Sequence, residues 1–198
     1  MSLVDAETGI NLFAVEEPNP NAPYPELSHL SPIAIHFLAG ILHGLSDIMP
    51  ILAPTINSYK RLVENYWAPV TVSWGLEHRS ASIRVIAPPV APAKATRFEI
   101  RTPGADANPH LALGAILALG IYGIENELEL PVPPLPQTEE ELVSVKLERL
   151  PASLKEANGK FMAEGSVARK VFGHDFVNHF GASRAHEVRI WEEAVTDW

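Results

Sequence analysis

The chain has 198 residues, no cysteine and a net charge of −9 at neutral pH. Without cysteine it has no disulfide framework, no thiolate metal site and no cysteine nucleophile. An acidic chain without a basic run argues against nucleic-acid binding, and the lack of both a long apolar stretch and a signal sequence argues against membrane insertion and secretion. We therefore expect a cytoplasmic protein. Since 46% of the residues are hydrophobic, we also expect the chain to bury its core as one domain.

The N-terminal segment is predicted to hold little regular structure. Short strand pieces are expected at 2–4 and 11–15, on either side of a turn that contains glycine. The loop over 17–27 contains four prolines, which argue against a regular helix or a central strand.

A long core helix is predicted over 31–53. Ser31 and Pro32 supply an N-cap and a first-turn proline, and apolar residues then recur every three or four positions. His36 and His43 lie seven positions apart on this helix, whereas a helical metal pair has a spacing of four. We therefore interpret both histidines as structural residues.

Three more strands are predicted at 70–74, 81–86 and 97–101, and prolines separate the last two. We expect these strands to pair as an antiparallel sheet. A further helix is predicted over 108–123, with Asn108 at its N-cap. Because this helix is apolar on all sides, we expect it to be buried.

The C-terminal part is predicted to be helical. A proline-rich linker at 131–136 separates it from the rest, so the domain 1–198 is divided into a part with the sheet and core helices, 1–136, and a helical part, 137–198.

Two capping boxes are expected in the helical part, Thr138 with Glu141 and Ser153 with Glu156. Three other polar residues are interpreted as surface or capping groups rather than a catalytic triad: His174, Asp175 and His179. We assign no chemistry to this part of the chain.

Positive charge is concentrated in one window of the sequence. Residues 60–101 include seven Lys or Arg and only three acidic residues, which favours an anionic ligand. Period-two alternation places Arg97, Glu99 and Arg101 on one face of the predicted strand, and Phe98 on the other. A solvated strand whose charges pair with one another explains this row equally well, at about 0–1 kcal/mol per exposed pair.

Other arginines favour the anion-binding interpretation. Arg61 follows a proline turn, and Arg79 and Arg84 bracket a run of small residues. Guanidinium groups bind phosphate and carboxylate oxygens in pairs, and Glu99 among them would repel an anion unless a divalent cation lay between. We therefore predict that these arginines share a pocket for metal-bridged phosphate chemistry with the strand 97–101.

Four motifs closely resemble the C-terminal part of the glutamine synthetase catalytic domain: A-P-T-I-N-S-Y-K-R-L, H-R-S-A-S-I-R, R-F-E-I-R and A-N-P-H-L-A. The resemblance covers nearly the whole chain. The variants E-N-Y-W-A-P and S-W-G-L-E-H-R look most like the glutamine-synthetase-like domain of fungal developmental regulators and bacterial relatives. The resemblance implies an α+β fold in which an antiparallel sheet is backed by helices and followed by C-terminal helices.

In this family ATP and glutamate, with Mg²⁺ or Mn²⁺, give a γ-glutamyl phosphate that ammonia attacks, and the resemblance implies the same ligase activity here. It assigns Glu99 to the metal and Arg61 to the α-carboxylate of the amino-acid substrate. Two catalytic arginines are implied to stabilise the transferred phosphoryl group, Arg79 and Arg101. Four residues are implied to bind the nucleotide: Arg84, Arg97, Lys94 and Ser2.

One position departs from the family pattern. Where glutamine synthetases have a flap glutamate in Y-E-A-P, this chain has Trp67 in Y-W-A-P. An indole neither deprotonates ammonium nor carries negative charge. We therefore expect Trp67 to change the choice of amine acceptor.

The family's other metal-binding groups are glutamates and a G-x-H-x-H stretch, which fall ahead of Met1. We therefore expect the chain to be an incomplete piece of the ligase that is inactive alone. The expected partners are ATP and a glutamate-like substrate, and the expected full-length protein is a homo-oligomer. Two alternatives stay open: a non-catalytic glutamine-synthetase-like module for assembly or signalling, and a γ-glutamyl ligase for another amine.

Overall fold

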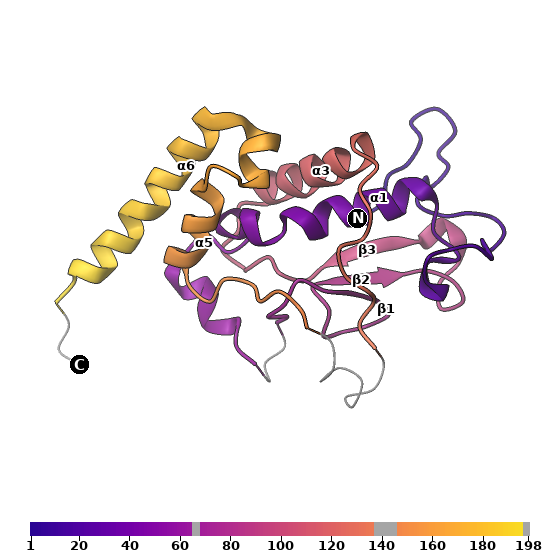
Figure 1. The fold of residues 1–198 in the computed structure, drawn as a ribbon, viewed down its shortest axis with the longest axis horizontal. Coiled ribbons are helices and arrows are strands. Elements are labelled where there is room, and N and C mark those ends of the chain that lie inside the picture. The colour runs from indigo at the N-terminus through magenta and orange to yellow at the C-terminus, as the bar shows by residue number, and fades with distance from the viewer. Residues whose placement is uncertain (65–67, 137–145, 196–198) are drawn as a thin grey trace. The chain divides into compact units, whose positions relative to one another are not determined.

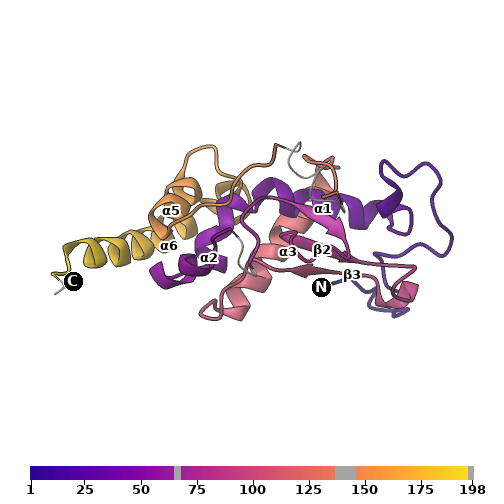
Figure 2. The same cartoon turned by 90° about the horizontal axis from the view of Figure 1, so that it is seen from below.

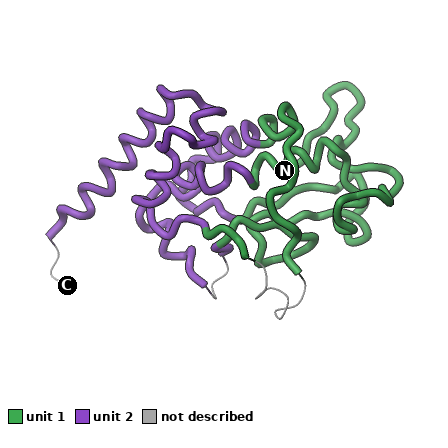
Figure 3. The backbone as a smooth tube through the Cα atoms, in the orientation of Figure 1, with its two compact units in different colours: residues 1–42, 71–101, 120–149 green, residues 43–70, 102–119, 150–198 purple. Residues whose placement is uncertain are grey.

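The computed structural model describes residues 1–64, 68–136 and 146–195. The chain divides into two compact units (Figure 3). Unit 1 comprises residues 1–42, 71–101 and 120–149, and Unit 2 comprises residues 43–70, 102–119 and 150–198.

Unit 1 contains a three-stranded sheet in the order β1-β2-β3 (Figures 1 and 2). The strands are β1 (Trp74–Leu76), β2 (Ile83–Ile86) and β3 (Arg97–Ile100). β2 and β3 are antiparallel as expected, but β1 and β2 are parallel, so the expectation of an entirely antiparallel sheet is wrong. The segment between β1 and β2 has no Asn-Gly or Asp-Gly turn that favours a hairpin. The sheet is therefore mixed, within the predicted α+β class.

Three buried phenylalanines hold the first helix, α1 (Pro32–Gly44), on this sheet. The ring centroids of Phe37 in α1 and Phe98 in β3 lie 6.4 Å apart, and Phe13 lies 5.1 Å from Phe37 and 4.8 Å from Phe98. Such aromatic pairs add about 0.5–1.5 kcal/mol beyond their burial. Because Phe98 points into this core, its neighbour Glu99 points to the exposed face, as the alternation predicted.

The helix predicted over 31–53 is interrupted. It begins as expected, because Ser31 Oγ accepts a hydrogen bond at 3.1 Å from the backbone N–H three residues further on. After α1 the chain forms two short helical segments, η2 (Ser46–Ile48) and α2 (Met49–Leu52). Pro50 has no N–H to continue the helical hydrogen bonding, which explains the break.

Within the described ranges, no single helix is long and apolar enough to cross a bilayer. In the part of the chain that the structure describes, α1 together with the bent segment that follows it reaches that length and composition.

Helix α3 (Pro109–Glu125) starts where the sequence predicts it. Asn108 Oδ1 accepts hydrogen bonds from the backbone N–H groups two and three residues further on, at 3.0 and 3.3 Å. The expectation that the helix is buried on all sides is wrong, since Leu113 is 55% exposed and Ile121 is 46% exposed. Apolar composition alone therefore did not identify the buried face.

The C-terminal end of α3 lies in direct backbone contact with α1. A Cβ added at Gly123 would lie 2.1 Å from the backbone oxygen of His36 and 2.7 Å from the backbone of Gly40. His36 Nδ1 lies 3.0 Å from the backbone oxygen of Leu128, which agrees with its interpretation as a structural residue. At position 123, only glycine permits the close approach of α3 to the backbone of α1.

Unit 2 contains the two C-terminal helices, α5 (Leu154–Met162) and α6 (Val167–Glu193). Ser153 caps α5, since its Oγ accepts a hydrogen bond from the backbone N–H of Glu156 at 3.1 Å. The Glu156 carboxylate accepts from the backbone N–H of Ala152 rather than from that of Ser153. Half of this predicted capping box therefore forms.

The start of α6 is held by Asp47, whose Oδ2 accepts a hydrogen bond from the backbone N–H of Val167 at 2.7 Å. The helix is broken at Gly173, which has a φ of 77° that glycine adopts without strain. The other predicted capping box, Thr138 with Glu141, lies outside the described residues.

The strand pieces predicted near the N-terminus form only isolated bridges, Val4 with Asn11 and Ala14 with Leu30. Asn11 also donates its side-chain amide to the backbone oxygen of Thr96 at 2.8 Å, which ties this segment to the start of β3. Three short 3-10 helices complete the described elements: η1 (Pro25–Leu27), η3 (Ile56–Arg61) and η4 (Ala93–Ala95).

Candidate functional site

The exposed face of β2 and β3 carries a row of alternating charges in Unit 1. The antiparallel register places Arg84 opposite Glu99. Arg84 Nη1 lies 3.1 Å from Glu99 Oε2, and Arg101 Nε lies 3.3 Å from Glu99 Oε1. Each carboxylate oxygen of Glu99 thus faces one guanidinium, while its side chain stays 43% exposed.

A second carboxylate, Glu77, joins this row from the segment after β1. Its Oε2 pairs with Arg84 Nη2, and this hydrogen bond, followed by the weaker contribution of Glu99, raises the pKa of Arg84. Glu77 has a φ of 53°, which is uncommon for a residue other than glycine. Sequence reasoning counted Glu77 only as an acidic residue, because its partner lies on another strand.

The carboxylates of this row are of the chemical type that binds divalent cations. Mg²⁺ is usually bound through one or two carboxylates together with substrate phosphates and waters. Glu99 offers one exposed carboxylate, and Glu77 lies on the other side of Arg84. Among the described residues, no group of three or more His, Asp or Glu gathers as a metal cage. The carboxylates of Glu77 and Glu99 are the hard oxygen groups that this row offers to a cation.

The other predicted nucleotide residues of Unit 1 lie around this sheet. Arg97 is exposed on β3 and donates Nη1 to the backbone oxygen of Ala95 at 2.9 Å. Lys94 is exposed in η4. Ser2 is half-buried and follows Met1, whose ammonium donates a hydrogen bond to the backbone oxygen of Phe98 in β3 at 2.6 Å. The predicted catalytic residue Arg79 is exposed in the segment between β1 and β2.

Arg61 lies in Unit 2, at the end of η3. Its Nη2 donates hydrogen bonds to the backbone oxygens of Thr102 and Pro103, both at 2.8 Å. This guanidinium therefore holds the segment that leads into α3. Because Arg61 and the charged row of β3 belong to different units, the single pocket predicted for all the arginines stays a prediction.

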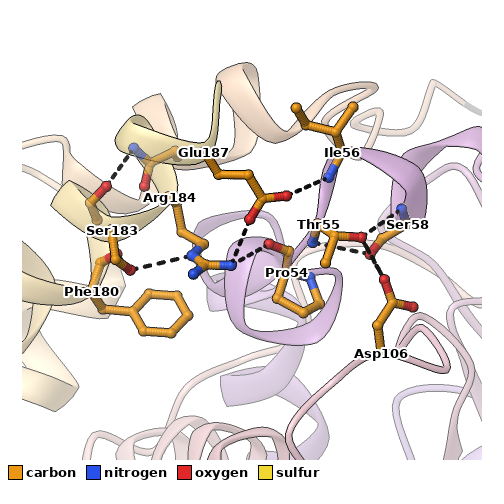
Figure 4. A network of polar contacts seen from close by, with 11 residues as sticks. Pro54, Thr55, Ile56, Ser58, Asp106, Phe180, Ser183, Arg184 and Glu187 are labelled. Carbon is orange, nitrogen blue, oxygen red and sulfur yellow. Dashed lines mark hydrogen bonds and ion pairs between the residues drawn. The ribbon is translucent and has the colours of Figure 1, made fainter. Parts of the chain in front are cut away.

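Asp106 fixes the start of η3 from the same segment (Figure 4). Its Oδ2 accepts hydrogen bonds from Thr55 Oγ1 at 2.5 Å and from Ser58 Oγ at 2.8 Å. Thr55 and Ser58 also cap η3 reciprocally. These two hydrogen bonds, with a smaller contribution from Arg61, hold the pKa of Asp106 below its ordinary value. Sequence reasoning missed Asp106, because it lies far along the chain from its partners.

Replacing Asp106 by Asn is expected to lower stability at neutral pH by less than about 1 kcal/mol, because the group is exposed. In the folded state the pKa of Asp106 is lowered from 3.8. The stabilisation by the Asp106 carboxylate is therefore present above pH 3.8 and is lost as the pH falls through the pKa of the folded state. Urea unfolding from pH 7 to pH 3 should therefore show the difference between wild type and variant shrinking in acid. A difference that is constant with pH contradicts this assignment, and Asp175→Asn on α6 is the control.

Several known proteins are similar to this chain in sequence. A family model described as "Glutamine synthetase, catalytic domain" matches residues 1–198. Type-1 glutamine synthetase 2 of Dictyostelium discoideum is 40% identical over 193 residues, which are 97% of this chain and 34% of that protein. The glutamate–isopropylamine ligase of a Pseudomonas species is 39% identical over 199 aligned positions, which cover 100% of this chain and 40% of that protein.

A third relative is the gamma-glutamylethanolamide synthetase of Streptomyces coelicolor, 36% identical over 169 residues that are 85% of this chain and 35% of that protein. The chain thus spans between 34% and 40% of the length of these relatives. Among solved structures, the GmaS/ADP complex matches with a TM-score of 0.75 and 28% identity, over 97% of this chain and 42% of that chain. Trp67, where the sequence departs from the family motif, lies outside the described residues.

Proposed function

Because the chain belongs to the glutamine synthetase family, whose catalytic-domain model matches all of it, we propose that it forms part of an ATP-dependent ligase that joins glutamate to ammonia through γ-glutamyl phosphate. The observation that carries this proposal is Glu99 flanked by Arg84 and Arg101 on one exposed sheet face. Phosphoryl transfer spreads negative charge over the transferred oxygens, and fixed cations stabilise that charge.

Arg84 and Arg97 are assigned to the ATP phosphates. Glu77 and Glu99 already orient the Arg84 guanidinium, so less conformational freedom is lost when a phosphate arrives. A planar fork held in this way also favours paired contacts to phosphate oxygens. Two further residues are assigned to nucleotide contacts: Ser2, near the start of the chain, and Lys94, just before β3.

Glu99 is assigned to the divalent cation, Mg²⁺ or Mn²⁺. When bound, such an ion neutralises phosphate charge and orients the phosphates. Glu99 itself supplies a hard oxygen ligand, and its exposed side chain leaves room for a cation. Arg79 and Arg101 are assigned to stabilising the transferred phosphoryl group.

Arg61 is assigned to the α-carboxylate of the amino-acid substrate. Its Nη2 is engaged with the backbone oxygens of Thr102 and Pro103, which fixes the direction of the guanidinium. A guanidinium is planar and carries five N–H groups, a geometry that matches the two oxygens of a carboxylate. The side chain is therefore prepared for a planar anion.

A second candidate function is a γ-glutamyl ligase for an amine larger than ammonia. Two of the relatives bear the names gamma-glutamylethanolamide synthetase and glutamate–isopropylamine ligase, and the second aligns with the whole chain. Trp67 in place of the flap glutamate favours this candidate, since an indole offers an apolar surface to an alkyl amine.

The experiment compares amines as acceptors in the enzyme that carries this chain. ATP, Mg²⁺ and glutamate are supplied with ammonium, ethanolamine or isopropylamine, and phosphate release and γ-glutamyl products are measured. The first candidate predicts that ammonium gives the highest kcat/KM. A preference for a larger amine rejects ammonia in favour of the second candidate. No phosphate release with any amine rejects both candidates and supports a non-catalytic module.

A further inference from the structure

Two charged residues of α6 form hydrogen bonds with the start of η3, and both elements belong to Unit 2 (Figure 4). Arg184 Nη1 donates to the backbone oxygen of Pro54 at 2.6 Å. Glu187 Oε1 accepts a hydrogen bond from the backbone N–H of Ile56 at 3.1 Å. The two side chains also pair with each other, Nη1 to Oε2, at 3.1 Å. They therefore hold the backbone on both sides of Thr55, the N-cap of η3.

These contacts satisfy backbone groups that a helix start cannot satisfy by itself. The first N–H groups of a helix have no partner within it, and Glu187 supplies one for Ile56. The side chains of Arg184 and Glu187 are only 22% and 33% exposed, so water competes weakly for these contacts. Hydrogen bonds to charged groups are worth about 1.5–3 kcal/mol, more than neutral ones.

The orientation of Arg184 is itself fixed by its own helix. Arg184 Nε donates to Ser183 Oγ at 3.3 Å, and Ser183 Oγ donates to the backbone oxygen of Phe180 at 2.6 Å. The centre of the guanidinium also lies 5.4 Å from the centroid of the Phe180 ring. A long, flexible side chain held at this many points acts as a rigid support.

η3 is so short that contacts at its first residues also affect the position of its last residue. The element has six residues, and Arg61 is the last of them. Asp106 holds the same N-cap through Thr55 and Ser58. The backbone that carries Arg61 is thus fixed at its start by α6 and by the segment before α3, and a shift at the start displaces the guanidinium at the end.

We propose that Arg184 and Glu187 are positioning residues, which act through η3 to set the Arg61 guanidinium for the carboxylate of the substrate. This inference rests on the role proposed above for Arg61. It gives the C-terminal helix, to which the sequence assigned no chemistry, a part in substrate binding. Small misplacements of a binding group reduce catalysis strongly, by up to about 100-fold for a shift of roughly 1 Å.

The test measures separate KM values for glutamate and for ATP in the enzyme that carries this chain. Arg184→Met is expected to raise the KM for glutamate about tenfold and to leave the KM for ATP within about twofold. Glu187→Gln is expected to give a smaller rise, about threefold, because the amide oxygen still accepts from Ile56 while the ion pair is lost. Arg184→Lys should recover part of the loss.

The matched controls are Arg189→Met and Glu192→Gln, which have the same spacing on α6 but are exposed. Both should leave the two KM values unchanged. Urea unfolding is measured in parallel, because a purely structural role lowers stability without a selective change in the KM for glutamate. If Arg184→Met does not fold, Glu187→Gln decides the question.

Arg61→Met separates the two levels of the proposal. If it raises the KM for glutamate but Arg184→Met and Glu187→Gln do not, the positioning role is overturned and the role of Arg61 stands. If Arg61→Met leaves glutamate binding unchanged, the assigned role of Arg61 fails. An equal rise in the KM for glutamate and ATP in the α6 variants also overturns the positioning role, because it indicates general loosening.

Discussion

Replacing Glu99 by Gln is expected to lower kcat at least about 100-fold, because the variant loses the negative charge that we propose as a ligand of the divalent cation. The amide has nearly the same shape as the carboxylate, so the packing of β3 should be unchanged. Steady-state phosphate release at saturating ATP and glutamate measures the effect, with Mg²⁺ varied over a wide range. The Mg²⁺ concentration that gives half-maximal activity should also rise.

Unfolding experiments distinguish this effect from a loss of structure. The ion pairs of Glu99 with Arg84 and Arg101 are partly exposed, so their removal should change the free energy of unfolding by less than about 1 kcal/mol. Glu192→Gln, which removes a carboxylate paired with Lys155 on the surface, is the matched control and should keep full activity. A Glu99→Gln enzyme with activity within about threefold of wild type contradicts the metal assignment.

Replacing Gly123 by Ala is expected to lower the free energy of unfolding by about 3 kcal/mol or more. The new Cβ would lie 2.1 Å from the backbone oxygen of His36 and 2.7 Å from the backbone of Gly40. Overpacking typically costs about 1–3 kcal/mol, and here the clashing atoms are backbone, which cannot turn aside as a side chain can. Urea or thermal unfolding followed by circular dichroism measures the change.

Gly114→Ala provides the matched control on the same helix. No heavy atom lies within 4 Å of a Cβ added there, so the variant is expected to gain about 0.5–1 kcal/mol from the higher helix propensity of alanine. Opposite signs for the two substitutions support direct backbone contact between α1 and α3. A Gly123→Ala variant as stable as wild type shows that the helices do not approach so closely.

Local patterns in the sequence predicted the elements that depend on local interactions. The alternation around Phe98 placed Glu99 on the exposed face of β3, and the structure confirms this orientation. Asn108 marked the start of α3 because a cap bonds N–H groups only two or three residues away. Ser31 marked the start of α1 for the same reason.

Contacts between distant segments could not be predicted in this way. Glu77 reaches Arg84 because β1 and β2 run parallel. No turn motif in the sequence predicted this parallel pairing. Asp106 lies 51 residues from Thr55, and Arg184 lies 130 residues from Pro54. Such polar pairs depend on the packing of whole elements, which residue spacing does not encode.

A crystal structure of the enzyme that carries this chain, with ADP and Mn²⁺ bound, tests the central claim most directly. The claim is that the exposed face of β2 and β3 forms the metal and phosphate site. The anomalous signal of Mn²⁺ is expected within coordination distance of a carboxylate oxygen of Glu99, with phosphate oxygens in hydrogen-bond contact with Arg84. Mn²⁺ and the phosphates bound elsewhere, with Glu99 still paired only to Arg84 and Arg101, would contradict it.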